Sequence, residues 1–224
     1  MEILERFKEI ISTSEKPYVI ELGCCDSYHS KIMLDILQGT GKDYTYHLFE
    51  PNADLVNSVV SNLQHYLSSK PDNVKFFNEA IGAENSVMTF YKSGGQKLDD
   101  NGHVLDTYYG SSSIRKPKLV TEVWKDMKFS ETTASVVSLD YHVERCNLKN
   151  RVIDFIWADI QGAEVDLIKG GKEAFKNVRY LYTEYGGSGY YEGEIGRDEI
   201  ISMLPDFELI EDYGGDIILK NKNL

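Results

Sequence analysis

The sequence predicts an α/β fold with a mostly parallel, seven-stranded sheet and helices on both faces. Strand-like and helix-like patterns alternate three times between residues 18 and 82. Helices of about 10 to 15 residues between strands favour crossover connections, which make neighbouring strands parallel. The tail, residues 207–220, has two strand-like runs on either side of Tyr213, Gly214 and Gly215, which predicts a C-terminal antiparallel hairpin.

The composition predicts one compact domain over residues 1–224, because 42% of the residues are hydrophobic. The 36 acidic residues outnumber the 24 lysines and arginines, and the net charge of −12 would repel a nucleic-acid backbone. No stretch approaches the roughly 20 apolar residues that span a bilayer. The three cysteines, of which Cys24 and Cys25 are adjacent, lack metal-site spacing. We therefore expect a cytoplasmic protein with reduced thiols and no nucleic-acid partner, and leave homo-oligomerisation open.

The first half of the chain contains a clear succession of elements. Residues 1–16 have Ile3, Phe7 and Ile10 at helical spacing and predict an N-terminal helix that ends before Pro17. The pattern then gives a buried strand at residues 18–22, a helix at 30–38, a strand at 44–50, a helix at 53–67 and a strand at 73–82.

The middle of the chain, residues 92–118, breaks this pattern. It is rich in Gly, Ser and Asp and is too long for an ordinary connector, so we expect an irregular loop that is either a candidate lid or disordered. After it come a strand and short helix at 131–148, a central strand at 151–160, a helix at 163–175 and a strand at 178–186.

Acidic residues end most of the predicted strands. In open α/β sheets, ligands bind beyond the carboxyl ends of the strands. The acids at these ends are Glu21, Glu50, Glu79, Asp159 and Glu184. Like charges at close range destabilise a fold, so a ligand that carries hydroxyls, an amine or positive charge is indicated.

The first strand-to-helix turn narrows the choice of ligand. The stretch "ELGCCDSYHS" has one glycine, Gly23, where a dinucleotide site needs three, and it places Asp26 where a phosphate would lie. NAD, FAD and ATP are therefore disfavoured, whereas S-adenosylmethionine has a ribose, an adenine and a sulfonium but no phosphate. Glu50 is positioned to accept hydrogen bonds from ribose hydroxyls, although it also suits an exposed strand-end acid.

Several motifs resemble those of the FkbM-type S-adenosylmethionine-dependent methyltransferases. The strongest is "DFIWADIQGAEVDLIKGG" at residues 154–171, and "LFEPN", "NEAIG", "GSSSI" and "VVSLD" occur in the expected order. The resemblance covers about residues 17 to 190 and implies a Rossmann-like class I methyltransferase fold with O-methyltransferase activity. The first turn departs from the family pattern, because the usual Asn and second Gly are replaced.

The resemblance also implies how the cofactor is held. The residues it assigns to S-adenosylmethionine are Glu21, Gly23 and Cys24 near the methionyl part, Glu50 and Pro51 near the ribose, Glu79, Ala80 and Ile81 near the adenine, and Asp159 near the sulfonium.

Methyl transfer to a hydroxyl needs an aligned acceptor and a base that removes its proton. Asp159 and Glu184 end neighbouring strands and are the favoured candidates, because mutual burial would raise one pKa into the range of a base. His142 is a further candidate that also suits a structural histidine. Glu164 either points into the cleft or caps its own helix. Oxygen ligands from Asp159, Glu164 and Glu184 would suit Mg²⁺, and this metal option stays open.

The expected acceptor is a small polyhydroxylated molecule, a sugar or glycan that is nucleotide-linked or part of a polysaccharide. The residues expected to bind it are Tyr108, Tyr109, Ser112, Gln161, Glu164 and Tyr185, from segments that mix glycine, aromatic and hydroxyl side chains. The alternatives are a catalytically silent binding module and a methyltransferase that acts on a lipid or polyketide hydroxyl. A nicotinamide dehydrogenase is disfavoured by the missing glycines.

Overall fold

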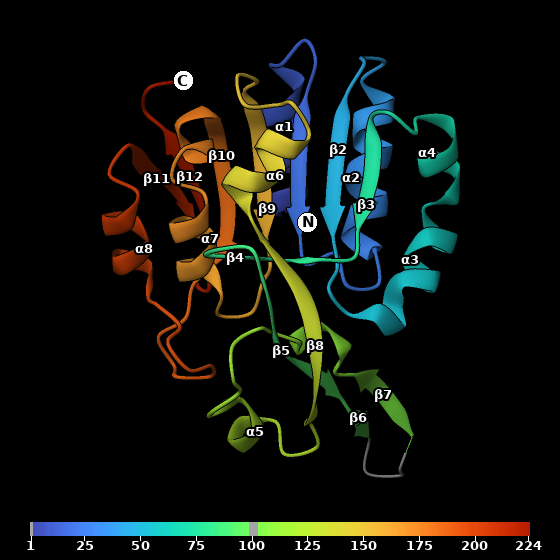
Figure 1. Ribbon diagram of the computed structural model, residues 1–224, viewed down its shortest axis with the longest axis vertical. Helices are drawn as coiled ribbons and strands as arrows, with labels where there is room; N and C mark the ends of the chain where they lie inside the picture. The colour runs from blue at the N-terminus through green and yellow to red at the C-terminus, as the bar shows by residue number, and fades with distance from the viewer. Residues whose placement is uncertain (1, 99–102) are drawn as a thin grey trace.

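The computed structural model describes residues 2–98 and 103–224, and its main body is a seven-stranded sheet (Figure 1). The strand order is β11-β12-β10-β9-β1-β2-β3. The bounds are β1 Tyr18–Leu22, β2 Thr45–Phe49, β3 Val74–Phe77, β9 Ile153–Ala158, β10 Val178–Glu184, β11 Phe207–Asp212 and β12 Asp216–Asn221. Five strands pair in parallel, and β12 pairs antiparallel with β10 and β11. The predicted sheet and C-terminal hairpin are confirmed.

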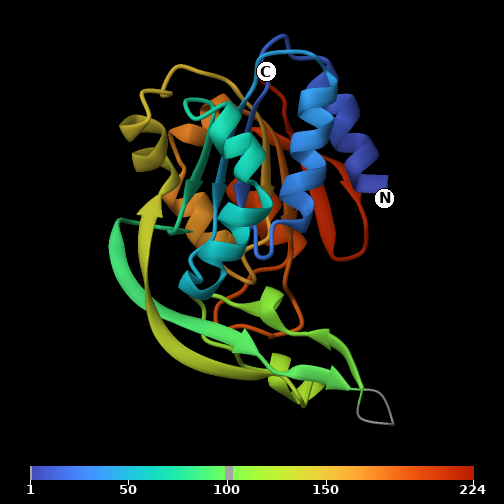
Figure 2. The same cartoon turned by 90° about the vertical axis from the view of Figure 1, so that its right-hand side faces the viewer.

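Helices cover both faces of this sheet (Figure 2). They are α1 Glu2–Ser12, α2 Tyr28–Gly39, α3 Val56–Asn62, α4 Gln64–Ser69, α6 Leu139–Arg145, α7 Glu164–Gly170 and α8 Arg197–Met203, with short 3-10 helices η1 Ala53–Leu55 and η3 Ala174–Asn177. Successive residues of β1 face opposite layers: Val19 packs with Phe7 and Leu34 of α1 and α2, while Ile20 packs in the cluster that includes Leu139 of α6. Every residue of β1 is buried, as a central parallel strand requires.

A second layer of β-structure, here called the extension, lies beyond the carboxyl ends of the parallel strands (Figures 1 and 2). Its three-stranded sheet has the order β4-β8-β5, with β4 Ala80–Gly82, β5 Ser86–Gly94 and β8 Lys128–Ser138. The pair β6 Gln96–Leu98 and β7 Val104–Thr107, the 3-10 helix η2 Tyr109–Ser111 and the helix α5 Val120–Val123 complete it.

The extension differs from the irregular loop expected over residues 92–118. Strand β5 continues to Gly94, and β6 pairs with β7 inside the expected loop. Residues 99–102 lie outside the described part. The reason is non-local: β5 pairs along its whole length with β8, more than 30 residues away in the sequence, and no local pattern shows that partner.

The strand expected over residues 73–82 is two strands in different sheets. Strand β3 ends at Phe77 and pairs with β2, whereas β4 begins at Ala80 and pairs with β8. The break at residues 78–79 carries the chain from the main sheet into the extension. In the described residues, none of the helices has the length and apolar character needed to cross a membrane.

Candidate active site

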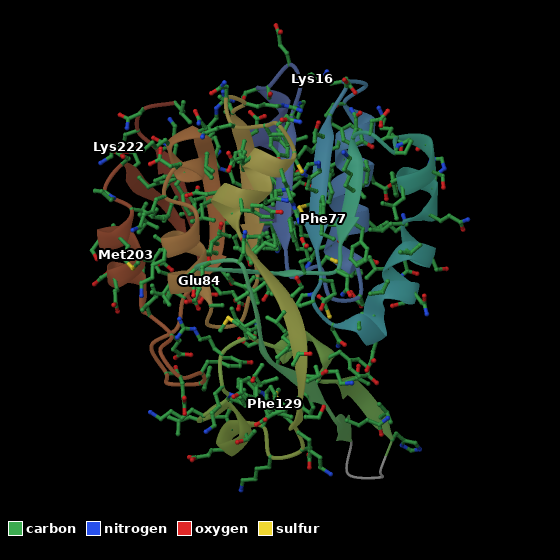
Figure 3. The ribbon with its side chains drawn as sticks, viewed as in Figure 1. Lys16, Phe77, Glu84, Phe129, Met203 and Lys222 are labelled. Carbon is green, nitrogen blue, oxygen red and sulfur yellow. The ribbon has the colours of Figure 1, made fainter. Side chains whose placement is uncertain are left out.

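A cavity lies at the carboxyl ends of the parallel strands, between the main sheet and the extension. Its walls are Leu22, Gly23, Cys25, Phe49, Glu50, Pro51, Glu79, Ala80, Ile81, Phe90, Tyr109, Gly110, Ser112, Ser113, Ile114, Asp159, Ile160 and Ala163. In Figure 3 the labelled Phe77 lies at the end of β3 and Phe129 lies in the extension, and the cavity takes residues from both of these parts. Among the residues that the structure describes, three walls are acidic, and none is a lysine, arginine or histidine.

The turn after β1 brings the backbone close to the neighbouring strands. Gly23 has φ 84°, and a Cβ atom there would lie 1.9 Å from the carbonyl oxygen of Asp159. The amides of Gly23 and Cys24 donate to the carbonyl of Phe49 over 3.0 and 2.9 Å. Only glycine suits this position. The Cys24 thiol is buried in the core beneath the turn and does not line the cavity, so any contact with a cofactor would come from its backbone.

Glu21 is buried beneath the cavity floor. Its Oε2 accepts hydrogen bonds from the hydroxyls of Ser30 and Tyr46, both over 2.6 Å. Burial raises the pKa of Glu21 to about 7. Because its carboxyl is engaged by α2 and β2 and does not line the cavity, Glu21 supports the turn from behind.

Glu50 lines the cavity, and two backbone amides fix its carboxylate. Its Oε2 accepts from the amide of Cys25 over 2.9 Å, and its Oε1 accepts from the amide of Asn52 over 2.7 Å. Burial raises the pKa of Glu50 to about 7. Each oxygen keeps a free lone pair, so the fixed carboxylate can accept from two adjacent hydroxyls. Pro51 lines the cavity beside it.

The wall near β4 is apolar except for Glu79. The Glu79 carboxylate is held in a bidentate ion pair by Arg145, with Oε1 and Nη1 2.9 Å apart. Ala80 and Ile81 are backed by β8, and the opposite wall includes Ile114. These apolar side chains beside the Glu79 carboxylate suit a flat aromatic ring with a polar edge.

Asp159 and Glu184 lie at the ends of β9 and β10, and the Gln161 side chain hydrogen-bonds both of them. The amide nitrogen of Gln161 donates to Asp159 Oδ1 over 2.7 Å and to Glu184 Oε2 over 2.8 Å. Burial raises the pKa of both acids, and it raises that of Glu184 further because the Asp159 carboxylate lies beside it. Asp159 lines the cavity, so the acid of the pair with the smaller rise in pKa is the one that a bound ligand would meet.

Glu164 is the first residue of α7 and lies under the turn. Its Oε1 accepts from the amide of Gly162 over 3.3 Å, whereas its Oε2 is buried without a hydrogen-bond partner. Burial raises its pKa to about 7. Glu164 thus bonds to the turn before its own helix and does not line the cavity.

His142 lies behind the cavity wall. Its ring is buried against Phe49 and Phe77, and its Nε2 is 3.0 Å from Nδ1 of His47. Because Arg145 can only donate, its contact of 3.2 Å requires Nδ1 of His142 to accept, so Nε2 carries the hydrogen. Burial lowers the pKa of His142 to about 2. The structure places His142 in a structural network, away from the cavity, and gives no support for its role as the base.

One group of described residues has potential ligand atoms close enough for a metal, within 4.8 Å: His47, His142 and Cys146. The hydrogen on Nε2 of His142 and the nearby charge of Arg145 oppose a bound cation. Within the described ranges, the oxygens of Asp159, Glu164 and Glu184 do not form such a group, so the geometry gives no support to the Mg²⁺ option.

The residues expected to bind the acceptor are divided. Tyr109 and Ser112 line the cavity, whereas Tyr108 is half-buried outside the lining. The hydroxyl of Tyr185 donates to Asp212 over 3.1 Å and points toward the C-terminal hairpin. The side-chain amide of Gln161 hydrogen-bonds Asp159 and Glu184 and does not line the cavity. Sequence reasoning missed Phe90, Ser113, Ile114 and Ala163 as walls; Ser113 and Ile114 lie in the "GSSSI" motif, which was a usable signal.

Comparisons with known proteins agree with this geometry. A family model described as "Methyltransferase FkbM domain" matches residues 26–215. The 2-O-methyltransferase NoeI of Sinorhizobium fredii (strain NBRC 101917 / NGR234) is 30% identical over 228 residues, which cover 99% of this chain and 87% of that protein. The crystal structure of a methyltransferase FkbM from Methylobacillus flagellatus KT aligns with a TM-score of 0.52 and 12% identity, over 92% of this chain and 44% of that chain. This chain thus spans less than half of that structure, and the likeness concerns the fold.

Proposed function

Because the chain belongs to the FkbM family of methyltransferases, we propose that it methylates a hydroxyl of a sugar or glycan with S-adenosylmethionine as the methyl donor. The observation that carries the proposal is the cavity with three acidic walls and no basic one. Carboxylate walls oppose the phosphates of a nucleotide cofactor, whereas they suit a sulfonium and hydroxyls. The similar protein NoeI is, by name, a 2-O-methyltransferase, which favours transfer to oxygen.

The cavity residues fit the parts of the cofactor. Glu50, fixed by two backbone amides, would accept from the ribose hydroxyls. Ala80 and Ile81 would contact the adenine, with Glu79 at its polar edge. Asp159 would face the sulfonium, whose positive charge would favour the ionised carboxylate. The close approach at Gly23 leaves room for the methionyl part. When bound, the cofactor supplies an electrophilic methyl group.

Asp159 is the proposed base. It lines the cavity and lies beside Glu184, whose pKa is raised further. An acceptor hydroxyl that donates to an ionised Asp159 would be placed for in-line attack, and its proton would pass to the carboxylate while the methyl–sulfur bond of the cofactor breaks and the oxygen–carbon bond forms. The amide group of Gln161 donates a hydrogen bond to each of the two acids. Tyr109 and Ser112 would contact the acceptor from the extension.

The test combines calorimetry with a transfer assay. The purified protein is titrated with S-adenosylmethionine and then incubated with it and a panel of mono- and oligosaccharides, nucleotide sugars, lipids and polyketides. We expect saturable binding of the cofactor and a mass gain of one CH₂ on a saccharide. Absence of cofactor binding would indicate a silent scaffold. Methylation confined to a lipid or polyketide would overturn the saccharide proposal alone.

A further inference from the structure

Tyr191 connects the loop after β10 to the Gln161 amide. It lies in the loop of residues 186–194, and its side chain is buried. Its hydroxyl shares its one hydrogen between two acceptors, the carbonyl oxygen of Ser111 at 2.6 Å and Oε1 of Gln161 at 3.3 Å. It therefore contacts both the extension and the side chain that bridges Asp159 and Glu184.

The loop that carries Tyr191 is fastened to the extension by its backbone. Tyr191 forms a β-bridge with Pro117, and the amides of Lys118 and Glu192 donate across the same junction over 2.7 and 2.9 Å. The Glu194 carboxylate accepts the amides of Gly187, Gly189 and Tyr191 over 3.0, 2.6 and 3.0 Å. Segments 108–118 and 186–194 thus form one joined layer over the acids.

The turn at Gln161 is held from the same layer. Gln161 has φ 51° and Gly162 has φ 89°, an uncommon backbone that the surroundings must maintain. A Cβ atom on Gly162 would lie 2.9 Å from Cβ of Tyr191, so the tyrosine packs directly on the turn. The hydroxyl of Ser113 donates to the Gln161 carbonyl over 2.7 Å.

The amide of Gln161 has one useful orientation. Its nitrogen must face Asp159 and Glu184, because its oxygen would meet carboxyl oxygens there and gain at most one hydrogen bond. Its oxygen then faces the Tyr191 hydroxyl. The two acids thus favour this orientation, and the Tyr191 hydroxyl adds a donor on the side of the amide oxygen, which limits rotation about the last torsion.

We propose that Tyr191 is a positioning residue for methyl transfer, which holds the Gln161 amide against Asp159 and Glu184 and links that arrangement to the joined layer of segments 108–118 and 186–194. The role in transfer rests on the proposed function. The link between Tyr191 and the carboxyl pair does not, and it is measurable without an acceptor.

The contact between Tyr191 and Gln161 predicts the direction in which the pKa of Asp159 changes when either residue is replaced. Hydrogen bonds from Gln161 stabilise the ionised Asp159, so any change that loosens the amide raises the pKa of Asp159. Gln161→Met removes the donor with little change in size and has the full effect, about one pH unit. Tyr191→Phe keeps the ring that packs on Gly162 and frees the amide, so its effect has the same sign and is smaller.

The experiment follows the side-chain carboxyl carbons by ¹³C NMR during a pH titration of the cofactor-free protein. The variants are Tyr191→Phe and Gln161→Met, and the matched control is Tyr66→Phe, which removes a tyrosine hydroxyl bonded to Asp35 far from the cavity. We expect upward shifts of the Asp159 titration in the first two variants and none in the control. At a pH above the Asp159 titration of both proteins, calorimetry should give wild-type affinity for S-adenosylmethionine in Tyr191→Phe.

An Asp159 titration in Tyr191→Phe that matches the control would overturn the proposal, and so would a lower transfer rate without that shift, because it would show a merely structural role. If Tyr191→Phe fails to fold, the Gln161→Met titration decides: no shift there refutes the link. Absence of methyl transfer by the wild type would refute the proposed function while the titration still reads the link.

Discussion

Asp159 and Glu184 show how burial gives two similar side chains different states. Both end parallel strands, and both share the Gln161 amide. The pKa of Glu184 rises further because the Asp159 carboxylate lies beside it, and Asp159 is the member of the pair that lines the cavity. Because the pKa of Asp159 is itself raised, the rate should rise with pH as this carboxyl loses its proton and then level off.

Replacing Asp159 tests its role as the base. We expect Asp159→Asn to lower turnover about 100-fold or more, because the amide cannot take the acceptor proton. Glu184→Gln is the comparison, since Glu184 lies outside the cavity lining and its raised pKa favours a neutral group there, and it should retain more activity. Thermal unfolding checks that both variants fold. Wild-type turnover in Asp159→Asn would remove it from the mechanism.

Glu50 and Glu21 form a matched pair of buried glutamates. Glu50 lines the cavity and Glu21 does not, although burial raises the pKa of each to about 7. Glu50→Gln should weaken S-adenosylmethionine binding by about 1 to 3 kcal/mol, through the loss of charge-assisted acceptance from the ribose. Calorimetry measures this, with Glu21→Gln as the control that keeps its affinity. Equal affinities in both variants would show that the ribose is held elsewhere.

At the scale of elements, the turn between β1 and α2 sets the cavity floor. Gly23 and Gly41 both have positive φ, 84° and 68°, but a Cβ on Gly41 would meet nothing within 4 Å. Gly41→Ala should therefore cost about 1 kcal/mol of unfolding free energy from backbone strain alone. Gly23→Ala should cost about 3 kcal/mol or more, since the Asp159 carbonyl must also move. Denaturant unfolding of the two variants measures the difference; equal costs would contradict the close approach.

The start of α7 carries a pH-dependent cost through Glu164. The pKa of Glu164 is 4.5 in the unfolded chain and about 7 in the folded protein. The folded protein therefore binds this proton more tightly, and the resulting contribution to stability is fully present below about pH 4.5 and is lost as the pH rises through about 7. This shift corresponds to about 3 kcal/mol. The stability of Glu164→Gln relative to wild type should therefore increase by about that amount between pH 4.5 and pH 8. Thermal unfolding at both pH values measures it, with the exposed Glu144→Gln as the control variant.

At the scale of the molecule, the main sheet and the extension enclose the cavity together. Cofactor binding should slow amide hydrogen exchange in residues 20–24 and 49–51 of the main sheet and, in the same titration, in residues 110–114 of the extension. Residues 207–212 of β11, at the far edge of the sheet, serve as the internal control. Protection confined to the main sheet would mean that the extension does not close over the cofactor.

Much of this arrangement is readable from the chain because it depends on local order. Alternating strand and helix patterns place Glu50 and Asp159 at strand ends, and parallel strands carry those ends to one edge. The motif at residues 154–171 and the lone Gly23 indicate the family and its cofactor. Periodicity and short turns are properties of neighbouring residues, so the sequence by itself determined the sheet, the hairpin and the edge that holds the site.

The tertiary structure decided which of those side chains reach the cavity. Three candidate side chains instead form hydrogen bonds with groups behind the cavity walls: Glu21, Glu164 and His142. The β5–β8 pairing includes residues 92–94 of the expected loop, and Tyr191 reaches Gln161 from 30 positions away. Side-chain direction, a carboxyl's proton and the partner of an edge strand are set by atoms distant in sequence and near in space, and only the packed fold brings those atoms together.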